Sequence, residues 1–182
     1  IKLTMKFSNS NIQLAVVEDA NAIVQLLNEA YRGEASTKGW TTEAHLIAGN
    51  QRTNLQQLQN VLTQVNSMFL KYTNNNAQIV GCVNLQITNE GIYLGMFSVH
   101  PLIQNEGIGK QLLQAAEEFA IAKNIHRIYM TVIDLRTELI AWYERKGYSN
   151  TRLEIAFNED EISGKHLQSL NFTVLEKYII IK

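Results

Sequence analysis

The sequence predicts a mixed α/β fold, in which an antiparallel strand meander and a parallel strand pair share one α+β sheet. Residues 67–72, 77–88 and 91–100 have the two-residue period of strands, and the short turns between them favour antiparallel neighbours. An amphipathic segment over 107–123 then separates two strands, and such a crossover makes those strands parallel. The chain has 182 residues and no Pro/Gly-rich linker, so we expect a single domain over 1–182.

The elements before the meander begin with a strand expected over 12–17. The helix that follows is expected to bury an apolar stripe made of Ile23, Leu26, Leu27, Ala30 and Tyr31. Residues 33–39 are expected to form a loop.

Two further helices are expected before the meander. Thr41 or Thr42 is expected to cap a short helix that ends near Gly49. Thr53 and Gln56 form a capping box that predicts the next helix. The inner face of that helix is expected to consist of Leu55, Leu58, Leu62 and Val65.

The elements after the meander alternate between helix and strand. We expect a helix over 107–123, a strand over 126–133, a helix over 137–146, and strands over 148–157 and 172–181. Gly147 follows the second of these helices at the position where a left-handed cap is needed. The acidic segment 158–166 is expected to be a solvated loop.

Composition excludes several classes of protein. The chain has 16 Lys and Arg against 17 Asp and Glu, and a net charge of −1 does not suit a nucleic-acid binder. One cysteine cannot form an internal disulfide, which favours a cytoplasmic location. The apolar runs are too short to cross a membrane, and the N-terminus lacks the apolar core of a secretory signal. The chain begins with Ile, so we expect Met5 as the natural start and residues 1–11 to be added or poorly ordered.

The most informative segment joins the third meander strand to the 107–123 helix. Its sequence is Gln104-Asn105-Glu106-Gly107-Ile108-Gly109-Lys110. Two glycines at a helix start leave backbone N–H groups open to an anion, and the helix dipole and Lys110 add positive charge there. The segment therefore predicts a pyrophosphate site. A strand-to-helix turn that happens to contain two glycines is the alternative.

The segment departs from two well-known phosphate motifs. A Walker P-loop needs glycine at 104 and Ser or Thr at 111, where this chain has Gln104 and Gln111. A dinucleotide fingerprint needs glycine at 112, which is Leu112. Both of these motifs are therefore excluded.

A second motif lies in the helix expected over 137–146. Its sequence is Leu139-Ile140-Ala141-Trp142-Tyr143-Glu144-Arg145-Lys146-Gly147-Tyr148. This helix, together with Gln104-x-x-Gly107-x-Gly109 after a strand ending in Phe97-Ser98-Val99-His100-Pro101, resembles the GNAT (Gcn5-related N-acetyltransferase) superfamily. The resemblance covers residues 12–181 and implies the GNAT acyl-CoA N-acyltransferase fold, with helices on both faces of the sheet.

The resemblance implies direct transfer of an acetyl group from acetyl-CoA to an amine, without a covalent enzyme intermediate. It implies that the 96–99 strand pairs with pantetheine, that an N–H such as that of Phe97 polarises the thioester carbonyl, and that residues 104–110 hold the pyrophosphate. The cofactor-binding residues that it implies are Phe97, Ser98, Val99, Gln104, Asn105, Glu106, Gly107, Ile108, Gly109, Lys110 and Arg136. Arg136 stands where relatives often carry asparagine, and it could instead pair with Glu138.

Tyr143 is implied to be the general acid for the departing thiolate. A thiol has a pKa of about 8.5 and a phenol of about 10, so a hydrogen bond can suffice. The alternative is a core aromatic residue on a helix face. The sequence agrees with a mechanism that lacks a covalent intermediate, because Cys82 lies within a strand pattern and no Gly-x-Ser-x-Gly elbow is present.

The candidates for binding the amine acceptor are Glu34, Trp40 and Glu43. An aromatic wall and a carboxylate suit a cationic amine, although Glu43 could equally be a first-turn residue that favours the helix dipole. The four histidines show no metal-ligand spacing, so no metal is expected. The expected partner is a small-molecule or peptide amine, with no nucleic acid and no membrane, and a homodimer is left open.

Two other functions are compatible with the sequence. A GNAT-fold module could bind an acyl-CoA or regulate without transferring the acyl group, although such a module has no need of Tyr143. A plain structural or interaction domain is the third candidate, and the glycine pair argues against it.

Overall fold

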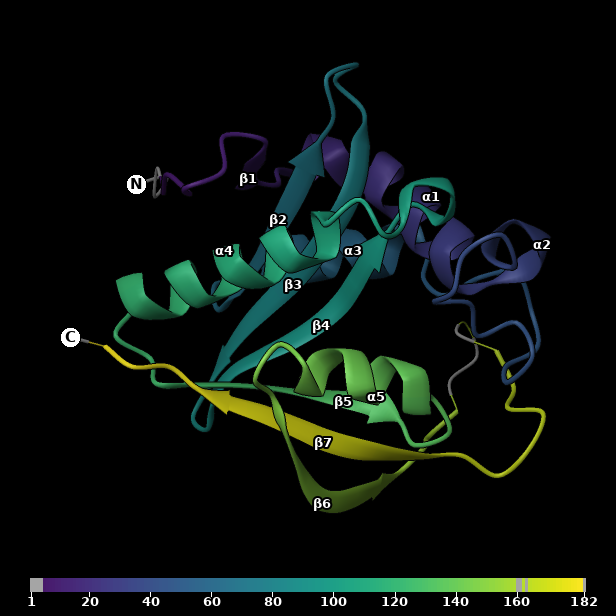
Figure 1. Ribbon diagram of the computed structural model, residues 1–182. Helices are drawn as coiled ribbons and strands as arrows, with labels where there is room; N and C mark the ends of the chain where they lie inside the picture. Colours follow the sequence, from purple (N-terminus) through teal and green to yellow (C-terminus); the bar gives the residue numbers. More distant parts are fainter. Residues whose placement is uncertain (1–4, 160–161, 163, 182) are drawn as a thin grey trace.

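A seven-stranded mixed sheet forms the centre of the molecule (Figure 1). The computed structural model describes residues 5–159, 162 and 164–181. The strand order is β1-β2-β3-β4-β5-β7-β6, in which β4 and β5 are parallel and the other neighbours antiparallel. The strands are β1 (Ile12–Leu14), β2 (Ser67–Thr73), β3 (Ile79–Thr88), β4 (Gly91–Val99), β5 (Arg127–Ile133), β6 (Ser149–Ala156) and β7 (Asn171–Tyr178).

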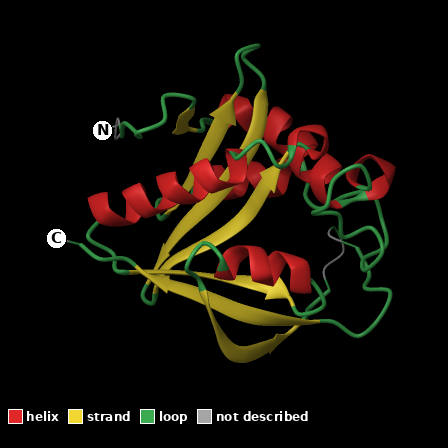
Figure 2. Cartoon of the chain, in the orientation of Figure 1, coloured by secondary structure: helices red, strands yellow, loops and turns green. Residues whose placement is uncertain are grey.

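Helices cover both faces of the sheet, which confirms the predicted fold class (Figure 2). On one face α1 (Ala20–Tyr31) and α3 (Leu55–Thr63) bury a cluster that includes Cys82. On the other face α4 (Ile108–Ala122) and α5 (Thr137–Glu144) pack over a larger cluster that includes Val83. Cys82 and Val83 are neighbours on β3, and a strand covered on both faces is a continuous apolar run because successive side chains point to opposite faces.

The predicted meander is present as β2, β3 and β4, each antiparallel to the next. The expected crossover helix is α4, and it joins the parallel strands β4 and β5. Gly147 has the left-handed φ of +87° predicted for the residue that ends the α5 turn. Short helical turns, α2 (Gly33–Ser36), η1 (Val17–Asp19) and η2 (Pro101–Ile103), complete the chain.

The strands β4 and β5 diverge soon after they meet. Their parallel pairing is limited to Ile92–Ile128 and Tyr93–Tyr129, and beyond it the two strands separate in Figure 1. Tyr93 Oη lies 2.8 Å from Thr131 Oγ1, so a side-chain hydrogen bond spans the point of divergence. The edge of β4 beyond Tyr93 therefore has no strand partner on the β5 side.

A β-bulge lies in this unpaired part of β4. On the β3 side Cys82 pairs with Ser98 and Asn84 with Gly95, so Met96 and Phe97 together stand opposite the single residue Val83. Met96 has a φ of +44°, which is uncommon for a residue with a side chain. The bulge turns the backbone of residues 96–97 out of the ladder where β4 leaves β5.

The segment 41–49 is not the helix that the sequence predicts. It forms turns instead: Leu46 N and Ile47 N both donate to Glu43 O at 2.9 Å, and no further helical turn follows. The segment bonds to a distant part of the chain, since Ala48 N donates to Lys165 O at 2.8 Å. Long-range pairing replaces the local helix.

Three smaller differences concern α2, α3 and the N-terminus. Residues 33–36 form a helical turn within the expected loop, and the cap of α3 is Asn54, whose side chain accepts from Gln57 N at 2.9 Å, one position later than expected. Val65 lies beyond α3 and is 95 % exposed, so it takes no part in the inner face. Within residues 1–11, expected to be added or poorly ordered, Phe7 is buried in the core, and residues 1–4 lie outside the described part.

Candidate active site

Two cavities share part of their lining near the end of β4, where it diverges from β5. The first, which we call the α4–α5 cavity, has a volume of about 270 Å³. Its lining is Tyr31, Trp40, Thr41, Phe97, Ser98, Val99, Gln104, Asn105, Gly107, Ile108, Gly109, Lys110, Leu139, Trp142, Tyr143 and Lys146. Two of these residues are lysines and none is acidic, so the cavity favours an anion.

The loop before α4 presents backbone N–H groups to this cavity. Gly107 is the N-cap of α4 with a φ of +82°, and no side chain of the described residues caps the helix. Asn105 also has a left-handed φ, at +76°. Left-handed residues in such a loop turn successive N–H groups towards one side, which makes a concave anion site at the positive end of the helix dipole.

The side chain of Gln104 is used within the protein. It accepts a hydrogen bond from Trp40 N at 2.8 Å and donates to Thr41 Oγ1 at 2.7 Å and Val99 O at 3.0 Å. Gly39 allows this approach, because a Cβ at 39 would lie 2.7 Å from Gln104 Oε1. Gln104 thus ties the 39–41 segment to the loop before α4, and its side chain is already occupied by the protein.

An aromatic wall closes the inner end of the α4–α5 cavity. Trp142 lies between Trp40 and Phe97, with ring centroids 6.3 and 6.1 Å away, and packs edge-on to Tyr143 at 5.1 Å. Lys146 Nζ stands 5.6 Å from the Trp142 ring. These rings lie close to the start of α4, since a Cβ on Gly109 would stand 3.5 Å from both Phe97 and Trp142.

The second cavity, which we call the β4–β5 cavity, lies between the divergent strands and has a volume of about 130 Å³. Its lining is Tyr31, Glu43, Arg52, Tyr93, Leu94, Gly95, Met96, Phe97, Met130, Thr131, Val132, Ile133, Arg136, Leu139, Tyr143 and Phe172. It differs from the α4–α5 cavity in having an acidic side chain, Glu43, beside two arginines, Arg52 and Arg136, all from separate segments of the chain.

The two cavities meet at Tyr31, Phe97, Leu139 and Tyr143, which line both. Tyr31 Oη donates a hydrogen bond to the carbonyl oxygen of Phe97, the bulged residue of β4. Burial raises the pKa of Tyr31 and raises that of Tyr143 well above the ordinary value for a phenol. Both phenols are thus protonated at neutral pH. Among the described residues the Tyr143 hydroxyl has no hydrogen-bond partner, so it is left for a ligand.

Arg136 is almost fully buried and holds the 40–41 segment. Its guanidinium donates to Trp40 O at 3.2 Å, to Thr41 O at 3.1 Å and to Glu138 Oε1 at 2.7 Å. Burial alone would raise the pKa of Glu138, but the bond from Arg136 outweighs it and lowers that pKa. The expected pairing of Arg136 with Glu138 is present. Arg136 lines the β4–β5 cavity, away from the loop before α4.

The structure brings together most of the predicted site residues and separates a few. Of the predicted cofactor-binding residues, all but Glu106 and Arg136 line the α4–α5 cavity, together with Tyr143. Trp40, predicted on the acceptor side, lines this same cavity. Glu43 lines the β4–β5 cavity and forms an ion pair with Arg32, and Glu34 is exposed outside both cavities.

Several lining residues were not predicted from the sequence as site residues. They are Tyr31, Thr41, Arg52, Tyr93, Thr131, Leu139, Trp142 and Lys146. Trp142 and Lys146 lie within the second motif, so their position beside Tyr143 was the available signal. Arg52 and Tyr93 carry no local signal, because only the pairing of distant segments brings them to the cavity.

Comparison with known proteins identifies the family of this chain. Residues 20–148 match the sequence profile of the acetyltransferase (GNAT) family. The chain belongs to the GNAT acetyltransferase family. GNAT membership confirms the resemblance inferred from the two motifs. The fold is similar to that of a solved structure: the ribosomal-protein-S18-alanine N-acetyltransferase from Escherichia coli superposes with a TM-score of 0.69 at 13 % identity, over 94 % of each chain.

The chain is also similar to other known proteins. The ribosomal-protein-alanine N-acetyltransferase from Brucella melitensis has a TM-score of 0.70 at 17 % identity, covering 92 % of this chain and 99 % of its own. The uncharacterized protein YdhI of Bacillus subtilis (strain 168) is 33 % identical over 75 residues, 41 % of this chain and 46 % of YdhI. The chain thus matches about half the length of this curated relative.

The described residues contain neither a membrane-spanning helix nor a metal-binding group of side chains. No described helix is long and apolar enough to cross a membrane. No group of three or more His, Cys, Asp or Glu side chains in the described part of the chain is placed to hold a metal ion.

Proposed function

We propose that this GNAT protein transfers the acetyl group of acetyl-CoA directly to the nitrogen of a primary amine. The observation that carries the proposal is the meeting of the two cavities at Phe97 and Tyr143. A donor that occupies the α4–α5 cavity and an amine that occupies the β4–β5 cavity reach each other only there. The bulge of β4 supplies backbone groups at that point, where the developing negative charge on the carbonyl oxygen needs a donor.

The donor is assigned to the α4–α5 cavity by its charge and shape. The backbone N–H groups from 105 to 110, with Lys110 and Lys146, suit the phosphates of CoA. The free edge of β4 beyond Tyr93 suits the amides of pantetheine, because it offers backbone groups that β5 does not pair. This division explains why a chain with a net charge of −1 needs no basic surface to hold CoA.

In the proposed transfer one bond forms and one bond breaks. The amine nitrogen forms a bond to the thioester carbonyl carbon, the carbon–sulfur bond breaks, and CoA leaves as a thiolate. Tyr143 Oη donates a hydrogen bond to that sulfur; because burial raises the pKa of Tyr143, full proton transfer to a thiolate is uphill and hydrogen bonding is its main contribution. The proton lost by the amine leaves towards Glu43 or solvent in the β4–β5 cavity.

Two assays test the proposal. CoA and acetyl-CoA should each raise the melting temperature of the protein in a saturable manner, because a ligand that binds only the folded state stabilises it. A thiol-release assay with acetyl-CoA and a broad panel of amines should then detect turnover. Absence of any thermal shift at millimolar CoA would contradict the proposal. Tight CoA binding without thiol release from any amine would favour the non-catalytic acyl-CoA-binding module instead.

A further inference from the structure

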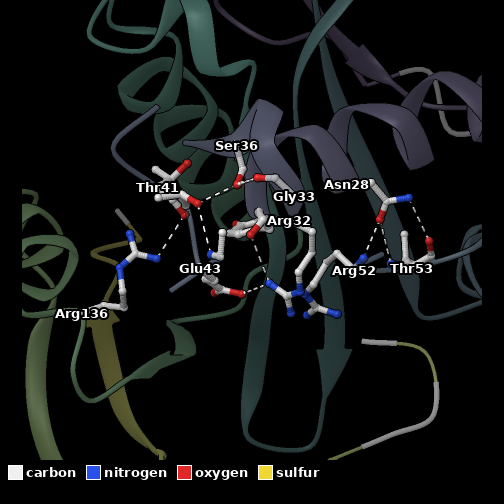
Figure 3. A network of polar contacts seen from close by, with 12 residues as sticks. Asn28, Arg32, Gly33, Ser36, Thr41, Glu43, Arg52, Thr53 and Arg136 are labelled. Carbon is white, nitrogen blue, oxygen red and sulfur yellow. Dashed lines mark hydrogen bonds and ion pairs between the residues drawn. The ribbon is translucent and has the colours of Figure 1, made fainter. Parts of the chain in front are cut away.

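The β4–β5 cavity contains an arginine whose position is fixed by the backbone around it. Asn28 of α1 accepts hydrogen bonds from Arg52 N at 2.6 Å and from Thr53 N at 3.1 Å, and it donates to Thr53 O at 3.1 Å. Figure 3 shows these three bonds, with the Arg52 side chain pointing towards Arg32 and Glu43. The clamp holds the 52–53 backbone against α1, so the Arg52 side chain starts from a defined place at the cavity.

The charges that face this cavity do not cancel. Glu43, its acidic lining residue, is ion-paired with Arg32. The Arg136 guanidinium donates hydrogen bonds to two backbone carbonyls and to Glu138. Arg52 is partly buried and, among the described residues, its guanidinium has no hydrogen bond or ion pair. A guanidinium presents several donors in a rigid fork that matches an oxyanion. One such fork is therefore available to a ligand in the cavity.

We propose that the amine acceptor also carries an oxyanion, a carboxylate or phosphonate, which binds Arg52 while the amine faces Phe97 and Tyr143. The inference rests on the proposed acetyl transfer and names its substrate class: a small, amino-acid-like amine.

The same charges argue against a polycationic acceptor. Each additional ammonium group of a polyamine would have to enter a cavity that already holds the uncompensated positive charge of Arg52. Tyr31 and Tyr143 line the same cavity and carry no negative charge at neutral pH. Like charges brought together in a partly desolvated cavity repel strongly. A zwitterionic amine places its negative group at Arg52 and its amine at the junction, so both charges are matched.

The test compares amines that differ only in the anion. The probes are amino acids, the matching amino acid amides, aminophosphonates and polyamines, each assayed by thiol release with acetyl-CoA. The best amino acid or aminophosphonate should exceed its uncharged counterpart in kcat/KM by about 10- to 100-fold, the usual range for a charge-assisted hydrogen-bonded pair. Arg52→Gln should remove this preference mainly through a higher KM, and Arg52→Lys should keep part of it.

A matched control and a second readout make each outcome decisive. Arg152→Gln removes the same charge from an exposed position on β6 and should leave the preference intact. The second readout is the melting temperature of the CoA complex, which amino acids should raise in the wild-type protein but not in Arg52→Gln. Unaltered CoA-induced stabilisation of Arg52→Gln verifies that the variant folds.

The outcomes separate this inference from the proposed function. Turnover that prefers uncharged amines or polyamines, or a preference that Arg52→Gln leaves unchanged, would overturn the inference while the transfer activity stands. Arg52-dependent binding of amino acids without thiol release would support the inference and contradict the transfer activity. Amino acids that neither bind the CoA complex nor react would overturn the inference.

Discussion

The α4–α5 cavity and the β4–β5 cavity are built in different ways. The α4–α5 cavity takes its anion-binding groups largely from one continuous stretch of backbone, residues 104–110, at the start of a helix. The β4–β5 cavity takes its charged groups from side chains of three separate segments, with Glu43, Arg52 and Arg136. A site made of backbone requires a particular local conformation, whereas a site made of side chains can change its specificity one residue at a time. The first kind suits a cosubstrate common to a family, and the second suits a variable acceptor.

The largest effect is expected from a substitution that alters only the α4–α5 cavity. Gly107→Glu places a carboxylate where the N–H groups converge, and like-charge repulsion of several kcal/mol predicts a loss of CoA affinity of about 100-fold or more. Gly107→Asn is the matched control, because asparagine tolerates the left-handed φ of +82° without adding charge. Calorimetric titration with CoA measures both. Equal affinity of the two variants would show that the phosphates lie elsewhere.

A smaller effect is expected at the junction of the cavities. Tyr143→Phe should lower kcat by about 100-fold, since it removes the donor to the departing sulfur, and should leave the Kd of CoA almost unchanged. Tyr148→Phe is the control: its hydroxyl is buried without a partner among the described residues, so removing it should retain kcat and stabilise the fold by about 1 kcal/mol. Steady-state kinetics that show the same kcat for Tyr143→Phe and wild type would return Tyr143 to a packing role.

A third change tests whether the two cavities depend on a common support. Arg136→Ala removes hydrogen bonds to Trp40 O and Thr41 O and should destabilise the protein by about 2–3 kcal/mol, because buried acceptors lose their donor. The 40–41 segment lines the α4–α5 cavity, so the KM of acetyl-CoA should rise as well. Glu138→Gln keeps an acceptor for Arg136 and should have little effect. Denaturant unfolding and initial rates measure the two quantities, and a change in acceptor KM alone would disprove the common support.

The smallest effect concerns pH. Burial raises the pKa of Tyr143 well above its ordinary value, so the residue stays protonated from about pH 6 to about pH 9. Deprotonation of the acceptor amine should then govern the profile, and kcat/KM should rise with pH over this range without a descending limb. A fall in kcat/KM below about pH 9 that is absent from Tyr143→Phe would mean that Tyr143 ionises in the working range.

The contrast between the cavities also explains what the sequence could and could not predict. Gly107 and Gly109 lie two residues apart at a helix start, so their conformation and exposure follow from local rules, and the loop was predicted with the right strand before it and the right helix after it. Arg52 and Tyr93 reach the same cavity only because α1, β4 and β5 assemble around it. No local pattern contains that information.

The wrong expectation at 41–49 and the protein contacts of Arg136 have the same physical origin. The 41–49 segment has a capping residue and apolar positions typical of a helix. It forms turns instead, because Ala48 N donates to Lys165 O and Leu46 O accepts from Leu167 N, which pairs Ile47 with His166 in an isolated antiparallel bridge. Arg136 was assigned to the cofactor from its place in the motif, but its guanidinium is occupied by the 40–41 carbonyls and Glu138. In both cases, long-range hydrogen bonds decided the outcome over local preference.

The central claim is that donor and acceptor meet where the two cavities join, and a crystal structure with CoA and an amine bound tests it most directly. The account predicts phosphate oxygens within hydrogen-bond distance of the N–H groups of residues 105–110. It predicts the CoA sulfur beside Tyr143 Oη and the amine in the β4–β5 cavity. CoA phosphates away from the start of α4, or a sulfur that does not reach Tyr143, would contradict it.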